Sequence, residues 1–468
     1  MRPAVALFVF AHILCLNAQE KQEKIHWHVL SESDRDIVLR VDFDPADTSA
    51  MGIRDTRAFI LPSAKQPSVF YLKIIDSTIM NRLRVNGDSL PEVQVEIGTP
   101  YKIRELSGLP ISVSSVRAPA FRYLSITFKI SWENVGSDRV ARSKIKLTRE
   151  YAPLYEHHFL NYDENKYLFY KKPTQALIIA PVIFKTEILH YVKKKKDTRV
   201  RYVPIEDIGN TALQLARFIR HDYARHRTLF VLLAGKAPAI PAYIEQNEVG
   251  QPLIADNVYA NVAGEDHYPD LWIGRLPARN PKDLAIQLRR TEIYEKQALH
   301  SSVFKIDAKQ TRVSPAVIAR AFRDSGIIVY NGHGSSNRWD TGNFTVNHAE
   351  DLDNKNHCPI VLSASCYAGQ YAGRQPCLAE ALLQAQQHGT PTGATATLMS
   401  TTTQSWHSSG ESLNAMLDFK EKLLLEKKEI PLGLIISYSW IYLLEKHADH
   451  TTEKTWLLFG DPSVPVFR

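Results

Sequence analysis

Cysteine is scarce in this chain, with 4 in 468 residues. So low a content excludes a small scaffold built on disulfides. If the first 18 residues are an export signal, as argued below, removal of Cys15 leaves Cys358, Cys366 and Cys377. Three is an odd number, so at least one thiol is free or pairs with another chain. A cysteine that stays free in an exported protein needs a reason, and catalysis is one.

Long apolar runs are also missing beyond the N-terminus. No later segment matches the roughly 18 consecutive apolar residues of a membrane-spanning helix, so stable membrane insertion is not expected. Residues 1–18 have the pattern of a signal peptide: Arg2 is the positive start, 4–16 is apolar, and Ala18 precedes a cut that leaves Gln19 first. Cys15 could instead carry a lipid, but Leu14 before it is bulkier than such sites usually allow. We therefore expect a secreted or periplasmic protein.

The chain has no large excess of charge, no internal repeat and no low-complexity segment. Its net charge of +7 is spread over the whole length, and Lys193 to Lys196 is the only dense basic run. No aromatic residues interleave with that run, which favours a solvated helix end or loop over a nucleic-acid surface. Apolar content of 44% and charged content of 23% are typical of a globular protein. The length predicts two or three domains.

Residues 24 to about 149 have the pattern of antiparallel strands. From Tyr123 to Trp132 every second residue is apolar, which is typical of a half-buried strand. Residues 93–97 and 38–43 repeat this alternation, and prolines and glycines separate the runs. The pattern predicts an antiparallel sandwich or barrel-like module without a cluster of titratable residues that would mark a site.

After about residue 150, apolar strands alternate with helices. This pattern predicts an α/β fold with a parallel sheet covered by helices on both faces. The predicted strands are 176–180, 199–203, 229–233, 271–274, 303–306, 327–330 and 360–362. The predicted helices are 211–225, 281–296, about 314–323, and one that Pro376 opens and Gly389 closes.

Two segments of the α/β region end in reactive side chains. One strand-like run leads through Tyr330 to His333 and Gly334, and the other leads to Cys366. The carboxyl ends of parallel strands are where open α/β sheets place their sites. An imidazole within reach of a thiol can generate the thiolate nucleophile. Each segment alone is more often structural, because a free cysteine is usually a small buried residue and a histidine beside glycine a turn residue. Together, the two segments are a much more specific sign of thiol catalysis than either is alone.

Longer stretches carry a family resemblance. They are residues 255–275, 330–339, 363–369, 376–382, 391–393, 404–406 and 459–463. They resemble the catalytic domain of the gingipains, cysteine peptidases with a caspase-like fold, and the arginine-specific members most of all. After the signal peptide at 1–18, the resemblance implies a β-rich propeptide-like domain at 19–149 and a gingipain-like catalytic domain at 150–468.

The resemblance assigns roles to the reactive residues. It implies that Cys366 attacks the scissile carbonyl and forms an acyl-enzyme, with His333 as general base or ion-pair partner. The amides of Gly334 and Cys366 would form the oxyanion hole. The residues that would line the substrate pocket are Gln404, Trp406, Ala364 and Asn331. From the residues alone, Trp406 is as readily a core residue as a pocket residue.

Two further features follow from the same resemblance. Arg149 lies near the point where the family's propeptide is removed, so that an arginine-specific enzyme could cut itself there. The alternative is an exposed arginine in a linker.

A calcium ion is the one cofactor suggested, and none is required for the thiol chemistry. Asp266 and Asp270, with the carbonyls of Ala263 and Tyr268, match the family's calcium site. Lys236 stands where the family has a ligating aspartate, and an ammonium group opposes a bound cation. The alternative is that both aspartates are ordinary loop acids.

The chain also departs from the family near 297–302. There a strand-plus-helix unit is missing, and in gingipains that unit carries the third catalytic residue, a glutamate, and the aspartate that selects arginine. Neither can be placed on this chain. A sheet that loses one strand must close the gap or leave an edge exposed. The family's immunoglobulin-like domain and sorting tail are not found before Arg468, so surface attachment by that route is not expected.

These features predict an exported cysteine endopeptidase, made as a zymogen, that cleaves peptide bonds of protein or peptide substrates. A preference for cleavage after arginine is suggested only by the resemblance, because the residue that would select the side chain is missing. The pair of His333 and Cys366 can act without the third residue, because that residue mainly orients the imidazole. The alternative is a catalytically impaired relative that binds peptides or proteins. A non-peptidase hydrolase or transferase on the same fold is less well supported.

Overall fold

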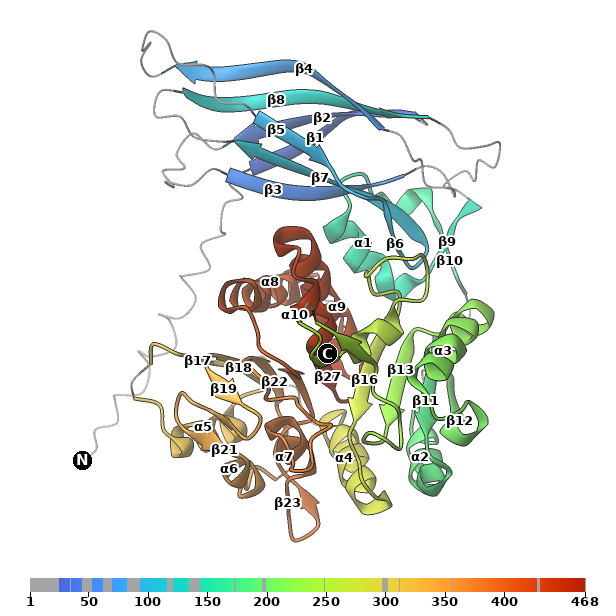
Figure 1. Cartoon of the computed structure of the whole chain (residues 1–468), viewed down its shortest axis with the longest axis vertical. Helices are drawn as coiled ribbons and strands as arrows, with labels where there is room; N and C mark the ends of the chain where they lie inside the picture. The colour runs from blue at the N-terminus through green and yellow to red at the C-terminus, as the bar shows by residue number, and fades with distance from the viewer. Residues whose placement is uncertain are drawn as a thin grey trace, which may run out of the picture. The chain divides into compact units, whose positions relative to one another are not determined.

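The computed structural model shows two compact units (Figure 1). The residues it describes are 25–33, 35–43, 53–61, 70–81, 93–115, 121–133, 144–171, 174–195, 199–247, 249–296, 302–310, 312–355, 357–426 and 430–467. The expected signal peptide, and residues 297–301 at the expected deletion, lie outside this set. The first unit takes residues 1–57, 62–98 and 111–139, and the second takes 58–61, 99–110 and 140–468.

The first unit is antiparallel, as its alternating pattern predicts. One sheet has the order β1-β2-β8-β4, and the other has the order β3-β7-β5. β6 pairs with residues 106–108 of β7, and this pair belongs to the second unit. Their bounds are β1 (Ile25–Glu32), β2 (Asp36–Phe43), β3 (Ile53–Ile60), β4 (Phe70–Asn81), β5 (Val93–Ile97), β6 (Tyr101–Ile103), β7 (Leu106–Ser115) and β8 (Phe121–Trp132). In β8, Phe128 and Ile130 are fully buried, which confirms the half-buried strand. Trp27 of β1 packs edge-on against Phe128 and donates a hydrogen bond to Asp55 of β3.

The second unit is built on one nine-stranded sheet of order β12-β11-β13-β16-β27-β25-β22-β18-β17. Its strands are β11 (Gln175–Ala180), β12 (Arg199–Pro204), β13 (Phe230–Ala234), β16 (Trp272–Leu276), β17 (Val303–Asp307), β18 (Ile327–Asn331), β22 (Ile360–Ala364), β25 (Ala396–Ser400) and β27 (Trp456–Phe459). All seven strands predicted for this region are present. The described neighbours pair in parallel except β25 and β27, which are antiparallel.

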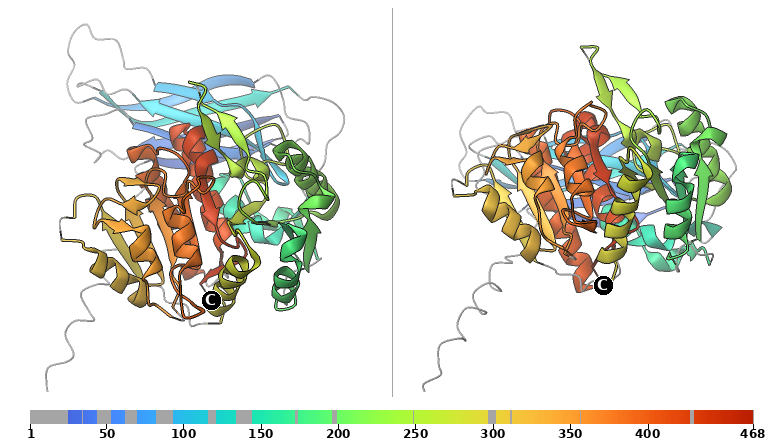
Figure 2. Two further views of the ribbon diagram at one scale, coloured as in Figure 1. Left: turned by 60° about the horizontal axis from the view of Figure 1, so that its bottom comes forward. Right: turned by 90° about the horizontal axis from the view of Figure 1, so that it is seen from below.

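Helices cover both faces of this sheet (Figure 2), which confirms the predicted α/β class. They are α1 (Ala152–His158), α2 (Lys185–Val192), α3 (Ala212–His226), α4 (Pro281–Tyr294), α5 (Pro315–Asp324), α6 (Val346–Glu350), α7 (Leu378–Gln384), α8 (Trp406–Leu425), α9 (Leu432–Tyr442) and α10 (His450–Thr455). In β13, Val231 and Leu233 pack on the α3 side, whereas Leu232 packs on the side of α2 and α4. In β18, Ile328 packs with α5, α6 and α7, and Val329 with α8 and α9.

Local sequence sets the helix starts. Thr211 and Gln214 form a reciprocal capping box at α3. Asn280 caps α4, whose first residue is proline, and Ser314 caps α5 in the same way. Among the described residues, no helix has both the length and the apolar content needed to cross a bilayer.

The helix predicted from Pro376 to Gly389 is shorter than expected. α7 ends at Gln384, and a hairpin of β23 (Gln386–Gln387) and β24 (Thr390–Pro391) follows. His388 and Gly389 both adopt positive φ, at 51° and 76°. Two such residues are typical of the tight turn of a hairpin, so the glycine serves the turn and does not end the helix.

Further short strands pair around the sheet. They are β9 (Lys146–Leu147) with β10 (Leu168–Phe169), β14 (Ile244–Gln246) with β15 (Pro252–Ile254), β26 (Ile430–Pro431) with β28 (Pro465–Phe467), and β19 (Gly334–Ser335) with β20 (Arg338–Trp339) and β21 (Phe344–Thr345).

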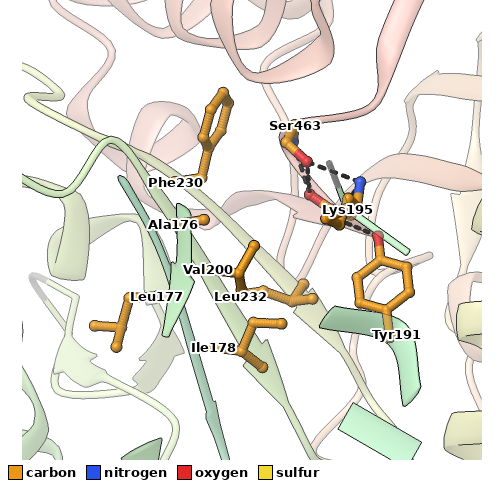
Figure 3. Close-up of a pocket in the computed structure, with 10 residues that line it drawn as sticks. Ala176, Leu177, Ile178, Tyr191, Lys195, Val200, Phe230, Leu232 and Ser463 are labelled. Carbon is orange, nitrogen blue, oxygen red and sulfur yellow. Dashed lines mark hydrogen bonds and ion pairs between the residues drawn. The ribbon is translucent and has the colours of Figure 1, made fainter. Parts of the chain in front are cut away.

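The described part of the basic run, residues 193–195, follows α2, and two of its lysines form ion pairs within the second unit. Lys194 Nζ lies 2.6 Å from Glu292, and Lys195 Nζ lies 2.5 Å from Glu295 and 3.2 Å from Asp461. Lys195 lines a small cavity with a volume of about 10 Å³ (Figure 3). None of the predicted site residues lines this pocket. These ion pairs support the helix-end interpretation of the run.

Candidate active site

The register of two neighbouring strands brings the histidine and cysteine segments together. β18 and β22 pair in parallel, with Asn331 opposite Ala364. His333 and Cys366 each lie two residues beyond this pair. Because adjacent strands lie about 4.8 Å apart, both residues leave the sheet at the same edge and side by side. A Cβ atom at Gly334 would lie 3.0 Å from Cβ of Ser365, so the two segments are in contact there.

Two hydrogen bonds to its carbonyl oxygen fix the backbone at His333. Its oxygen accepts hydrogen bonds from the Tyr330 hydroxyl at 2.5 Å and from the Asp340 amide at 3.0 Å. The exposed imidazole ring lies against the ring of Trp406, with centroids 5.1 Å apart. Among the described residues, no carboxylate contacts this imidazole. On that evidence the ring is oriented by its backbone anchors and by Trp406.

The Cys366 thiol lies at the surface between β22 and the loop after β25. It is partly exposed, and the amide of Gln404 points at its Sγ from 3.5 Å. The next residue, Tyr367, adopts φ of 59°, an uncommon conformation for a residue with a side chain. Its amide donates to the Thr402 carbonyl at 2.9 Å, which fixes the turn that presents the thiol.

The other two cysteines of the described chain are unsuited to nucleophilic chemistry. Cys358 and Cys377 are free and fully buried, and burial raises the pKa of each thiol. A buried thiol with a raised pKa carries little thiolate. Cys366 is therefore the candidate nucleophile of the three.

The residues expected to line the substrate pocket lie around this dyad. Trp406 begins α8 and is 49% exposed, so its ring is not part of the core. Asn331 ends β18, and Ala364 ends β22 beside it. The Oδ1 atom of Asn331 and both amide atoms of Gln404 are buried without a hydrogen-bond partner among the described residues. An unpaired buried polar atom costs about 1–3 kcal/mol, so these atoms are candidates to bind a polar ligand.

The carboxylates expected to bind calcium instead accept backbone hydrogen bonds. Asp270 accepts from the amides of Val262 at 2.8 Å, Ala263 at 2.5 Å and Arg104 at 2.6 Å. Asp266 accepts from the amides of Tyr268 at 3.0 Å and Lys102 at 2.8 Å. Burial raises the pKa of Asp270 to about 8.

A cationic group completes the mismatch. The Arg104 guanidinium donates to the carbonyl of Asp270 at 2.7 Å. Lys236 lies away from this site, because it follows the far end of β13, whereas Asp270 precedes β16 beside the start of β13. It is buried and pairs with Glu380 at 2.7 Å. Calcium needs the lone pairs that the amides already occupy, so the residues as arranged here do not fit the ion.

Two other expected features can be placed. On the side of β18, the described sheet ends at β17, which pairs with β18 alone. Arg149 is exposed, with its guanidinium 4.3 Å from the centroid of the Phe169 ring and 3.4 Å from Glu164. It begins a 3₁₀ turn, between the buried residues Leu147 and Tyr151. Cleavage after Arg149 stays a prediction.

Sequence reasoning did not identify a cluster of His407, Glu411 and His447 beside Trp406. The spacing of His407 and Glu411 in one helix is a signal that could have drawn attention to it. His447 lies far along the chain, and only the fold brings it near the other two.

A thiol and an imidazole are the two groups that a cysteine peptidase needs for its chemistry. The model of peptidase family C25 matches residues 170–311 and 300–467. The chain belongs to this family.

Relatives of known name agree. Gingipain R2 of Porphyromonas gingivalis (strain ATCC BAA-308 / W83) is 27% identical over 432 residues, covering 79% of this chain and 57% of that protein. Lys-gingipain HG66 of Porphyromonas gingivalis is 21% identical over 359 residues, covering 65% of this chain and 20% of that protein. The chain thus spans little more than half the length of the first of these relatives.

Two solved structures share the fold. The crystal structure of the Arg specific cysteine proteinase gingipain R superposes with a TM-score of 0.58 at 26% identity, covering 63% of this chain and 79% of that one. The complex of the Porphyromonas gingivalis RgpB pro- and mature domains gives 0.57 at 27% identity, covering 62% and 79%.

The matches also bear on the expected deletion. The family model matches in two pieces that share residues 300–311. An alignment of 432 positions that takes up only 79% of a 468-residue chain contains gaps on this chain's side. Neither observation says where the gaps lie, so the missing unit near 297–302 stays a prediction.

Proposed function

We propose that this chain is an endopeptidase in which Cys366 is the nucleophile and His333 is its acid–base partner. The observation that carries the proposal is the register of β18 and β22. It pairs Asn331 with Ala364, so that His333 and Cys366 each follow two residues after the end of their strand. Family membership supports the same chemistry.

The proposed mechanism is acyl transfer. The Cys366 thiolate attacks the scissile carbonyl carbon, and the carbon–nitrogen bond breaks as His333 gives its proton to the leaving amine. Water then attacks the acyl-enzyme, His333 takes the proton of that water, and the carbon–sulfur bond breaks. The amides of Gly334 and Cys366 are the proposed donors to the oxyanion.

The proposed substrates are proteins or peptides with arginine before the cut. The name of a matched structure, an Arg specific proteinase, supports this preference. So do the unpaired Oδ1 of Asn331 and Oε1 of Gln404, because both can accept from a guanidinium group. The exposed face of Trp406 can also attract a cation. Export through the signal at 1–18 and release of a zymogen by cleavage after Arg149 belong to the same proposal.

Covalent labelling tests the proposal. The full chain is treated with peptidyl electrophiles that carry arginine, lysine or alanine, and the modified residue is located by mass spectrometry. We expect the arginine probe to label Cys366 fastest, and Cys366→Ala to abolish labelling. Cys377→Ala is the matched control, because it removes a buried thiol and leaves labelling intact. A folded protein that no probe labels would sink the peptidase proposal.

A second candidate function is peptide binding without turnover. It is favoured by the lack of a carboxylate at the His333 imidazole among the described residues. This alternative would be supported if arginine peptides bind the protein that no electrophile labels, are not cleaved by it, and lose that binding when Asn331 is substituted.

A further inference from the structure

Three potential metal ligands converge beside the start of α8. Glu411 Oε1 lies 3.5 Å from His407 Nε2, and Glu411 Oε2 lies 3.2 Å from His447 Nε2. One ligand atom from each residue can be chosen so that all three lie within 4.8 Å of one another. We propose that His407, Glu411 and His447 bind a divalent transition-metal ion of the zinc type.

The spacing suits such an ion. Zinc binds imidazole nitrogen and carboxylate oxygen at about 2.0–2.2 Å, so that neighbouring ligand atoms of a tetrahedral site lie about 3.3 Å apart. The two separations, one to each carboxylate oxygen of Glu411, lie on either side of this value. The rings of His407 and His447 are edge to face with centroids 5.6 Å apart, and small side-chain rotations can bring their nitrogens together.

The fold holds the three residues in place. His407 and Glu411 are four residues apart in α8 and therefore share one face of the helix. His447 ends a π-helical turn, Leu443–His447, and Ala448 after it adopts the left-handed conformation. Single π turns occur often at functional sites.

A side-chain bridge ties these two segments together. The carboxylate of Asp449 accepts from the Ser408 hydroxyl at 2.5 Å and from the Thr452 amide at 2.9 Å. Ser408 follows His407 in the chain, and Asp449 lies two residues beyond His447. The two segments that carry the proposed ligands are therefore held together by contacts that do not depend on the ion.

An ordinary pair of histidine–carboxylate ion pairs is the competing explanation. Nε2 of His447 argues against it, because this atom is buried and forms no hydrogen bond with a described residue. It lies 3.2 Å from Glu411 Oε2, the separation of an ion pair. A buried nitrogen and a carboxylate oxygen that face each other at this distance can share an ion.

The donor set selects the class of metal. Two imidazoles and one carboxylate suit zinc and its neighbours in the first transition row, whereas calcium and magnesium prefer oxygen ligands alone. Three protein ligands leave a fourth position for water. His407 follows Trp406 directly, so a bound ion would fix the first turn of α8, which carries a wall of the proposed pocket. The site uses neither Cys366 nor His333, and its existence does not depend on peptidase activity.

Zinc binding to the full chain tests the site. The measurement is competition for Zn²⁺ with a chromogenic chelator, made on Cys366→Ala protein so that the thiol at the surface takes up no metal. We expect one ion per chain. His407→Ala, Glu411→Gln and His447→Ala should each weaken binding by more than about a hundredfold, because even the loss of a group behind a ligand costs about ten- to a hundredfold.

Controls separate the site from adventitious binding. His388→Ala removes an exposed histidine of the β23–β24 turn and should leave the affinity unchanged. Co²⁺ should give the intense visible absorption of four-coordinate cobalt with the parent, and lose it with the near-isosteric Glu411→Gln. Failure to bind Zn²⁺, or an affinity that the three substitutions change no more than His388→Ala does, would overturn the proposal.

Discussion

The ring of His333 lies against the ring of Trp406, with centroids 5.1 Å apart. Trp406 is half exposed at the start of α8, and the backbone amide of Gln404, two residues earlier, points at the Cys366 thiol. The indole is thus placed to limit the orientations of an imidazole that contacts no carboxylate among the described residues.

We expect Trp406→Ala to lower kcat/KM for arginine peptides on the order of a hundredfold, because small misplacements of a catalytic group can have effects of that size. Trp406→Phe keeps a flat ring and should retain most activity. Steady-state kinetics of both variants measures the effect. Equal losses in the two variants would contradict an orienting role for the ring.

Asn331→Ala should reduce the preference for arginine. The substitution removes the unpaired Oδ1 that is proposed to accept from the guanidinium group. We expect kcat/KM for an arginine substrate to fall about tenfold, in line with about 1.5 kcal/mol for a hydrogen bond to a charged group. Alanine substrates should be little affected. Parallel losses for both substrates would show that Asn331 serves the fold and not recognition.

Asp270 should give the folded chain a pH-dependent stability. Burial raises its pKa from 3.8 to about 8. Between these values the folded state keeps a proton that the unfolded state releases, so the contribution to stability is complete below pH 3.8 and is lost as pH rises through about 8. Urea unfolding of Asp270→Asn should show a flatter dependence on pH than the parent. Parallel curves would contradict the raised pKa.

Calcium should not stabilise the full chain through Asp266 and Asp270. Their carboxylates already accept five backbone amides, two of them from Lys102 and Arg104. An ion at a hundred times its dissociation constant would stabilise a folded protein by about 2.7 kcal/mol. We expect the unfolding midpoint to be the same with and without added calcium chloride. A rise that Asp270→Asn abolishes would show that the ion displaces the amides.

The sequence predicts the main sheet well because its strands are short, fully apolar runs. Such runs at 176–180, 229–233 and 360–362 are hard to place anywhere but in a covered parallel sheet. The antiparallel pairing of β27 could not be predicted in this way, because strand direction depends on how the chain returns through α9 and α10. The end of α7 was missed because Gly389 is equally typical of a helix end and of a hairpin turn.

The candidate site, too, could be predicted from the sequence only in part. The positions of His333 and Cys366 follow from strand ends and glycines, which are local features of the sequence. The part played by residues 99–110 does not, since Arg104 reaches Asp270 only in the folded second unit. His447 joins His407 and Glu411 for the same reason.

The most direct test of the account compares the rate at which the arginine electrophile labels Cys366 in the parent and in His333→Ala. An imidazole acting in acid–base catalysis typically contributes about 10²–10⁴-fold. The account predicts that labelling of the folded variant slows by at least a hundredfold. Labelling at the parental rate would show that Cys366 reacts without His333, and would contradict the proposed dyad.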